Sequence, residues 1–221
     1  MDKRGKLIVI DGSDGVGKAT QTVLLMKRLA KEKIPAKTLD FPQYKANLFG
    51  RLIRECLDGK YGDFIGLDAH IASALYAADR FEAKPKIEKW LSEGKTVILD
   101  RYVSANQLHQ GGKITDPKKR KEFLSWLDRV EFGVFKLPRP DRILYLHLPI
   151  KLSLQLIDKR GNKDLAEKNV RYLSDARESG LKMIQKGNKW KKIECSDGKG
   201  ILPREVIHEL IYADVRKIIG V

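Results

Sequence analysis

The chain has 221 residues, of which 42% are hydrophobic and 33% are charged, and its formal net charge is +15. This length and composition exclude a disordered protein and favour a single α/β domain, residues 1–221, with a substantial core. Cys56 and Cys195 lie far apart and have no CxxC partner, so neither a disulfide framework nor a zinc site is expected. The apolar run near the N-terminus is too short for a signal peptide or a membrane span, and we expect a cytoplasmic protein without membrane contact.

The excess of positive charge permits nucleic-acid binding, but it equally suits an enzyme that handles two polyanionic substrates. Basic residues are spread along the chain and are densest at Lys118–Lys121. The sequence has no RNA-binding aromatic motif and no zinc-finger spacing. We therefore interpret most of the charge as solvated surface, and we expect no nucleic-acid partner.

The first predicted elements are a short buried strand over 7–10 and a helix over 20–29, joined by a glycine-rich segment. This order is typical of a phosphate-binding loop. Glycines let successive N–H groups point at phosphate oxygens, and the helix N-terminus adds positive partial charge. Lys18 supplies a mobile full charge for the outer phosphates. We assign the following residues to ATP binding: Gly12, Ser13, Asp14, Gly15, Val16, Gly17, Lys18, Ala19 and Thr20.

The loop departs once from the pattern G-x-x-x-x-G-K-[ST]. Ala19 stands where the hydroxyl residue belongs, and Thr20 follows it. We therefore predict that Thr20, rather than residue 19, supplies any hydroxyl toward Mg²⁺. The alternative is a glycine-rich turn that binds no ligand, and the strand, helix and lysine around the loop argue against it.

The middle of the chain predicts a strand over 37–41, a helix over 48–57 and a long helix over about 68–92. Pro85 predicts a kink or break in the long helix. A buried strand over 96–99 is followed at once by Asp100 and Arg101. Ligands of open parallel sheets bind beyond the carboxyl ends of the strands, so we expect both side chains in the crevice of the phosphate loop. Asp100 is a candidate partner of Mg²⁺.

The rest of the chain predicts a turn-rich stretch and then further alternating helices and strands. We expect turns over 106–112, helices over 117–134, 153–157, 169–186 and 203–219, strands over 142–148 and 190–195, and a polar, basic lid segment at about 158–170. Strands alternating with helices predict an α/β fold: a parallel sheet of about five strands covered by helices on both faces.

Five short signatures follow one another along the chain: Ile10–Gln21, Phe41–Tyr44, Tyr76–Phe81, Asp100–Tyr102 and Ser104–Gln110. Together, and over nearly the whole chain, they resemble the thymidylate kinases, a family of P-loop nucleoside monophosphate kinases. The phosphate loop alone specifies only a protein that binds a nucleoside triphosphate. The resemblance implies transfer of the γ-phosphoryl group of ATP to dTMP, with Mg²⁺, giving dTDP and ADP, in a homodimer.

The resemblance also assigns substrate-binding roles. Without it, Tyr76 and Arg80 would be a half-buried aromatic and a surface arginine one helical turn apart. With it, Tyr76 stacks on thymine and Arg80 donates to a base carbonyl, while Asn106 reads the pyrimidine edge. The implied substrate-binding residues are Asp14, Phe41, Pro42, Tyr44, Tyr76, Arg80, Arg101, Asn106, His109 and Gln110.

The implied catalytic residues are Lys18, Asp14, Arg101 and a lid residue. Arg101 has a fork of five donors that suits a phosphate. Asp14, Thr20 and Asp100 are the candidate metal partners. The lid match is loose, with Arg160 ranked ahead of the other basic candidates, Lys159, Lys163 and Arg171.

His109 departs from the family, which usually has tyrosine or phenylalanine against the deoxyribose. Three other functions remain open at the level of sequence. The nearest is a kinase for another nucleotide or nucleoside, such as dUMP or dCMP. The others are a nucleic-acid-associated P-loop ATPase, favoured only by the net charge, and a non-catalytic nucleotide sensor, favoured only by Ala19.

Overall fold

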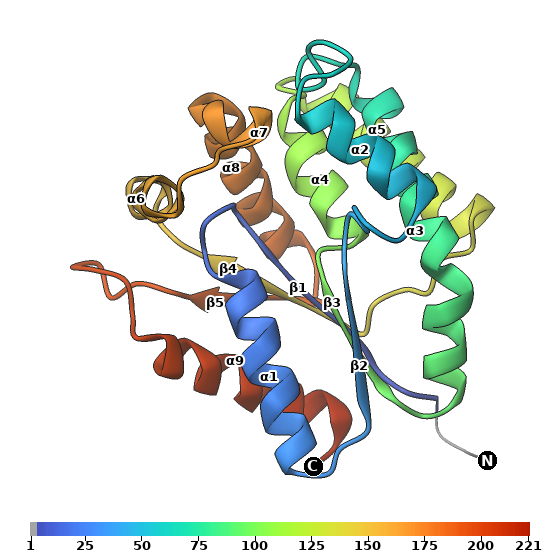
Figure 1. Cartoon of the computed structure of the whole chain (residues 1–221), viewed down its shortest axis with the longest axis vertical. Coiled ribbons are helices and arrows are strands. Elements are labelled where there is room, and N and C mark those ends of the chain that lie inside the picture. The colour runs from blue at the N-terminus through green and yellow to red at the C-terminus, as the bar shows by residue number, and fades with distance from the viewer. Residues whose placement is uncertain (1–3) are drawn as a thin grey trace.

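A sheet of five parallel strands forms the centre of the molecule, with helices on both faces (Figure 1). The computed structural model describes residues 4–221. The strands lie in the order β2-β3-β1-β4-β5 and are β1 (Leu7–Gly12), β2 (Ala36–Asp40), β3 (Thr96–Asp100), β4 (Arg142–His147) and β5 (Trp190–Glu194). The predicted α/β fold with about five parallel strands is confirmed.

The central strands are apolar on both sides because alternate residues point to opposite faces of the sheet. Leu7 and Val9 of β1 pack against helices of one layer, and Ile8 and Ile10 pack against the other. The first layer contains α3 (Ala69–Ser92), α4 (Val103–Gly112), α5 (Pro117–Asp128) and α8 (Val170–Lys186). The second layer contains α1 (Lys18–Lys31) and α9 (Arg204–Ile219).

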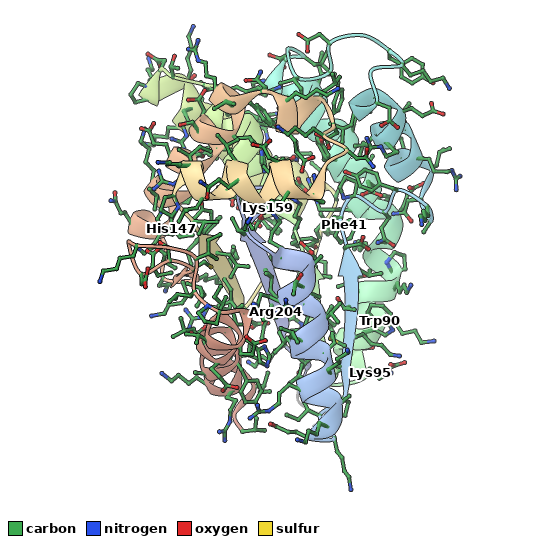
Figure 2. All side chains as sticks on the ribbon, turned by 60° about the vertical axis from the view of Figure 1, so that its left-hand side comes forward. Phe41, Trp90, Lys95, His147, Lys159 and Arg204 are labelled. Carbon is green, nitrogen blue, oxygen red and sulfur yellow. The ribbon has the colours of Figure 1, made fainter. Side chains whose placement is uncertain are left out.

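The remaining helices stand above the carboxyl ends of the strands. They are α2 (Leu48–Leu57), α6 (Ile150–Arg160) and α7 (Leu165–Lys168). From β1 the chain moves out to β2, returns through β3 beside β1, and continues on the other side with β4 and β5. Such a reversal leaves a crevice for a ligand beyond the strand ends. Figure 2 shows Phe41 at the tip of β2 and Lys95 near the opposite end of that strand.

Two predicted segments are wrong in part. Residues 106–112, predicted as turns, lie within helix α4. Two glycines at its end lower its helix propensity, but Val103 and Leu108 are buried in the core, and tertiary packing outweighs propensity. The helix predicted over 117–134 ends at Asp128 and continues as a π-helix, η1 (Arg129–Val134).

Pro85 lies inside α3 without ending it, so the predicted break does not occur. Proline removes one backbone donor and leaves the carbonyl of the residue four positions earlier without its partner. That residue is Phe81, whose side chain is 47% exposed, so water reaches this part of the helix. The other predicted elements differ from the structure mainly at their ends; the helix predicted over 153–157 extends over the whole of α6.

Candidate active site

The phosphate-binding loop joins the end of β1 to the start of α1. Gly12, Gly15 and Gly17 have φ values of 144°, 77° and 86°, which L side chains rarely adopt. At Gly12 there is also no space, because an added Cβ would lie 2.4 Å from the carbonyl oxygen of Leu146. Val16 packs its side chain into the core, so only its backbone is available to a ligand. The three glycines therefore give the loop the tight curvature that its sequence predicts.

Lys18 is the first residue of α1, and its ammonium group lies inside the loop. Nζ donates to the carbonyl oxygens of Ser13 at 2.8 Å and Gly12 at 3.3 Å, and it lies 3.6 Å from the carboxylate of Asp14. Burial lowers the pKa of Lys18, while the neighbouring carboxylates oppose that shift. A cation is thus held where the loop amides and the helix N-terminus converge.

Arg101 joins the loop to the end of β3. Its backbone φ is 66°, a left-handed conformation, and its N–H donates to the carbonyl of Ile10 at 2.9 Å. Its guanidinium pairs with Asp14 and lies 3.6 Å from Asp11. Burial alone would lower the pKa of Arg101, but the two carboxylates raise it. Burial likewise opposes ionisation of Asp14, yet Arg101 and Lys18 hold its pKa well below its usual range.

His109 is the second partner of Arg101, with 2.9 Å between Nε2 and the guanidinium. A guanidinium can only donate, so Nε2 accepts and the ring proton lies on Nδ1. Burial and the charge of Arg101 lower the pKa of His109 to about 3, so the ring is neutral at physiological pH. The imidazole stacks on Tyr172, with 5.4 Å between the ring centroids.

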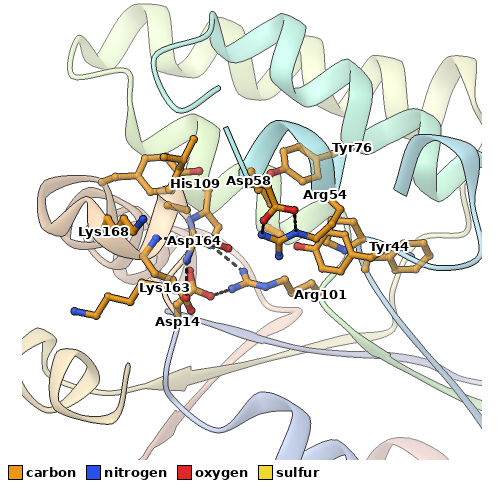
Figure 3. A pocket seen from close by; sticks show the side chains of 18 of the residues that line it. Asp14, Tyr44, Arg54, Asp58, Tyr76, Arg101, His109, Lys163, Asp164 and Lys168 are labelled. Carbon is orange, nitrogen blue, oxygen red and sulfur yellow. Dashed lines mark hydrogen bonds and ion pairs between the residues drawn. The ribbon is translucent and has the colours of Figure 1, made fainter. Parts of the chain in front are cut away.

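A cavity of about 660 Å³ opens beside this cluster, a size typical of small-molecule sites. Figure 3 shows Asp14, Arg101 and His109 joined by hydrogen bonds, with Tyr44 and Tyr76 on another side of the cavity. All ten predicted substrate-binding residues line it: Asp14, Phe41, Pro42, Tyr44, Tyr76, Arg80, Arg101, Asn106, His109 and Gln110.

A buried polar cluster closes one end of the cavity. Arg80, on α3, forms a two-pronged ion pair with Glu131 of η1 and donates to the carbonyl of Tyr102 at 3.3 Å. Asn106, on α4, donates through Nδ2 to Glu131 and to the carbonyl of Ser73, each at 3.2 Å. Arg80 and Asn106 are only 2% exposed. Helices rather than loops therefore fix the groups predicted to read a base.

The lid prediction corresponds to the end of α6, a four-residue loop and α7. Arg160 lines the cavity and pairs with Glu167, which belongs to a capping box with Asp164 at the start of α7. Lys163 also lines the cavity and pairs with Asp158. The other two candidates, Lys159 and Arg171, are outside the cavity lining, and the side chain of Arg171 is 86% exposed.

The candidate metal partners are less closely gathered than the substrate residues. Asp100 and Thr20 do not line the cavity, and Thr20 is exposed in the first turn of α1, next to exposed Ala19. Burial raises the pKa of Asp100. Between residues 4 and 221, no three or more His, Cys, Asp or Glu side chains are grouped to hold a metal ion.

Three residues at the site were missed from the sequence. Asp11 is fully buried at the end of β1, where it accepts from Ser104, and burial raises its pKa. Its position after a buried strand is the same signal that points to Asp100. Glu131 and Tyr172 lie on helices far along the chain from their partners, and no local pattern marks them.

The comparisons with known proteins converge on one family. A family model described as thymidylate kinase matches residues 10–206. The chain is 36% identical over 187 residues to a probable thymidylate kinase of Thermococcus gammatolerans, covering 82% of this chain and 84% of that protein. It is 32% identical over 215 residues to the thymidylate kinase of Homo sapiens, covering 94% and 88%.

A solved structure is similar in fold. It is the thymidylate kinase of Candida albicans, which has a TM-score of 0.74 and 23% sequence identity to this chain, and the match covers 98% of this chain and 94% of that one. At this identity the similarity concerns the fold alone. In the described part of the chain, no helix has both the length and the apolar character needed to cross a membrane.

Proposed function

The chain belongs to the thymidylate kinase family, and we infer from this membership and from the site that it transfers the γ-phosphoryl group of ATP to dTMP, giving dTDP and ADP. One observation carries the inference beyond the family. A single cavity has a buried pair of hydrogen-bonding side chains, Arg80 and Asn106, at one end and the Asp14–Arg101 cluster near the phosphate loop. That is the order of groups that a nucleoside monophosphate presents: base, sugar, phosphate.

The donor nucleotide is assigned to the phosphate loop. Backbone N–H groups and the N-terminus of α1 attract anionic oxygens, and Lys18 lies among them. Phosphoryl transfer requires in-line positioning and neutralisation of charge, and it needs little covalent chemistry from the protein. Lys18 and Arg101 supply positive charge on the two sides of the transferred group, and we assign no general base.

The acceptor nucleotide is assigned to the cavity. Tyr76 offers a ring for stacking on the base, and Arg80 and Asn106 offer polar groups for its edge. His109 and Gln110 are assigned to the sugar. Both have a buried polar atom, Nδ1 and Oε1, without a hydrogen-bond partner in residues 4–221.

The monophosphate group is assigned to the end of the cavity that holds Arg101. Phe41 and Pro42 form its wall, and Tyr44 contributes a hydroxyl beside them. Arg160 of the lid lines the same cavity and is the first candidate for stabilising the transition state. Closure of the lid segment would exclude water and suppress wasteful hydrolysis of ATP.

The residues present fit Mg²⁺ as a partner of the nucleotide rather than as a resident metal. Mg²⁺ at such sites is usually held by one or two carboxylates together with substrate phosphates and water. Asp14 and Asp100 would supply the carboxylates, and Thr20, in the first turn of α1, would supply a hydroxyl. When bound, Mg²⁺ would neutralise part of the negative charge of the phosphate groups.

The function is tested by coupled measurement of ADP release with ATP, Mg²⁺ and a panel of monophosphates. We expect dTMP to have the highest kcat/KM. Preferential turnover of dCMP or of a nucleoside would overturn the dTMP assignment. ATP hydrolysis that nucleic acid stimulates and dTMP does not would instead support a nucleic-acid-associated ATPase.

We further propose a homodimer located in the cytoplasm. Ile71 and Phe81 of α3 are 56% and 47% exposed, and exposed apolar side chains on one helix favour a protein contact. Cys56 and Cys195 are both buried as free thiols, which fits a reducing compartment. Analytical ultracentrifugation of the wild type and of Phe81→Glu tests the dimer, because the charge is expected to shift the wild-type dimer to a monomer.

A further inference from the structure

Glu131 is a fully buried carboxylate that belongs to none of the sequence signatures. It lies in the π-helix η1, and irregular helices of this kind often occur at functional sites. Both carboxylate oxygens are engaged by the guanidinium of Arg80, and Oε1 also accepts from Nδ2 of Asn106. One acidic side chain thus contacts both groups assigned to the base edge.

The contact with Glu131 fixes the orientation of the Asn106 amide. A carboxylate and a backbone carbonyl can only accept hydrogen bonds. Nδ2 donates to both of them, at 3.2 Å to Glu131 and 3.2 Å to Ser73. Turning the amide over would place Oδ1 against two acceptors. The oxygen therefore remains as the group that Asn106 can offer to a ligand, and it is an acceptor.

Glu131 also fixes the guanidinium of Arg80. Three of its nitrogens are engaged, two by Glu131 and one by the carbonyl of Tyr102. A guanidinium has five N–H groups and no acceptor, so donors remain for the cavity that Arg80 lines. Toward a ligand, Arg80 can only donate hydrogen bonds, and Asn106 is oriented so that it can only accept one. We call this fixed arrangement of one donor and one acceptor the polarity of the pair.

This polarity matches one class of pyrimidine. A 4-keto pyrimidine presents an acceptor at O4 and a donor at N3–H, whereas a 4-amino pyrimidine presents a donor at N4 and an acceptor at N3. We propose that Glu131 is a positioning residue that sets the polarity of Arg80 and Asn106 and so makes the cavity select 4-keto over 4-amino pyrimidine nucleotides. The proposal rests on the proposed function, because it takes the cavity to hold a pyrimidine monophosphate.

A purely structural role for Glu131 makes a different prediction. The ion pair between Arg80 and Glu131 joins α3 to η1. If joining these helices were its only role, breaking it would change kcat/KM for all substrates by the same factor. A positioning role affects 4-keto substrates alone, because only their hydrogen bonds depend on the polarity of the two side chains.

The test compares kcat/KM for dTMP, dUMP and dCMP in the wild type and in Glu131→Gln. Whichever way the new amide points, its NH₂ group faces a donor of Arg80 or of Asn106. We expect kcat/KM for dTMP and dUMP to fall together by roughly tenfold to a hundredfold, as expected when a buried polar contact is lost. The value for dCMP should change much less, and KM for ATP should stay the same.

A matched control is Asp214→Asn, which weakens another partly buried ion pair. Asp214 lies 3.0 Å from Arg142, outside the cavity lining, and its side chain is 12% exposed. This variant should leave the ratio of dTMP to dCMP turnover unchanged. Equal loss for all three nucleotides in Glu131→Gln would overturn the proposal and return Glu131 to a structural role.

Glu131→Asp keeps the proposal testable if the glutamine variant does not fold. It retains the charge but withdraws the carboxylate by one methylene, so it cannot contact Arg80 and Asn106 at once. The ratio of dTMP to dCMP turnover should fall in the same direction by a smaller factor, and an unchanged ratio would refute the inference. A wild type that turns over neither dTMP nor dUMP would overturn the proposed function together with the inference, whereas failure in the variants alone overturns only the inference.

Discussion

The two ends of the cavity are built in opposite ways. At the base end, Arg80, Asn106 and Glu131 project from three helices into the interior and hold one another. At the phosphate end, Asp14 and Arg101 come from segments that follow strands, and Arg160 comes from the last turn of a helix. Folding alone brings the side chains of the base end into contact with one another. At the phosphate end the cations are paired with carboxylates, and a bound phosphate would compete with those carboxylates for the cations.

Because the two ends are built differently, substitutions at one end should affect mainly stability and substitutions at the other mainly turnover. Breaking a buried ion pair leaves an unpaired charge in a low-dielectric interior and is strongly destabilising. The pairs at the phosphate end have access to the cavity, and their cations can exchange a carboxylate partner for a phosphate. Changes at the base end should therefore alter stability and dTMP affinity, and changes at the phosphate end should mainly alter kcat.

The largest expected effect comes from replacing Lys18 of the phosphate loop, which lies 3.6 Å from Asp14 at the phosphate end. Lys18→Met removes the cation of the loop but little packing volume, so we expect kcat to fall by about 10³-fold or more while the melting temperature stays within a few degrees. Circular dichroism and single-turnover transfer from ATP measure the two quantities. Lys27→Met, at an exposed position of the same helix, is the matched control and should retain normal turnover. Near-normal turnover by Lys18→Met would refute the assignment of the loop.

Replacing Arg80 tests the claim that folding completes the base end. Arg80→Met leaves Glu131 buried and unpaired, and we expect the free energy of unfolding to fall by about 3–5 kcal/mol. For a chain of this size that lowers the melting temperature by roughly 10 °C. The double variant Arg80→Met/Glu131→Leu removes both charges and should recover most of the stability without recovering dTMP affinity. Recovery of both would show that neither residue takes part in recognition.

The phosphate loop is easier to recognise in the sequence than Glu131 of the base end, because the residues of the loop are neighbours in the chain. The loop's glycines, Lys18 and the preceding strand stand within a dozen residues, so their geometry follows from neighbours in the chain. Arg80 and Glu131 are 51 residues apart, and Glu131 is an isolated acidic residue within an amphipathic pattern. Nothing in spacing or composition distinguishes it from a solvated glutamate.

The same argument explains the errors in the fold. The sheet was predictable because its central strands are short apolar runs. Helix α4 was not, because its glycines and polar residues are typical of turns, and its packing against other helices stabilises it. The contact between Arg101 and His109 was also not predicted. Arg101 has a left-handed backbone conformation, which the sequence does not indicate because the residue is not a glycine.

Arg160 is expected to separate turnover from binding within the phosphate end. It lines the cavity, and its own side chain is 56% exposed, but its partner Glu167 is buried, so Arg160→Met should lower stability by a small amount as well as changing turnover. If Arg160 stabilises the negative charge of the phosphoryl group in the transition state, kcat of Arg160→Met should fall by roughly tenfold to a hundredfold with little change in KM for dTMP. Arg171→Met, at a position outside the cavity lining, is the control. Equal effects of the two substitutions would remove Arg160 from the catalytic assignment.

The smallest expected effect concerns the pH dependence of stability that comes from His109, which contacts Arg101 of the phosphate end. The pKa of His109 falls from 6.5 to about 3 on folding, because burial and Arg101 disfavour the charged ring. Between these two values the unfolded chain binds a proton that the folded protein excludes, so acid favours unfolding. The contribution of His109 to stability is therefore fully present above pH 6.5 and is lost progressively as the pH falls toward 3.

Substituting His109 by phenylalanine removes this titration and retains a ring against Tyr172. Between pH 6.5 and about 4.5, the wild type should lose on the order of 1–2 kcal/mol more of its free energy of unfolding than His109→Phe. Urea titrations at intervals across that range measure the difference. Parallel curves for wild type and His109→Phe would mean that the ring accepts a proton in the folded protein, and the hydrogen bond from Arg101 to Nε2 would then be wrong, because a protonated imidazole has no acceptor.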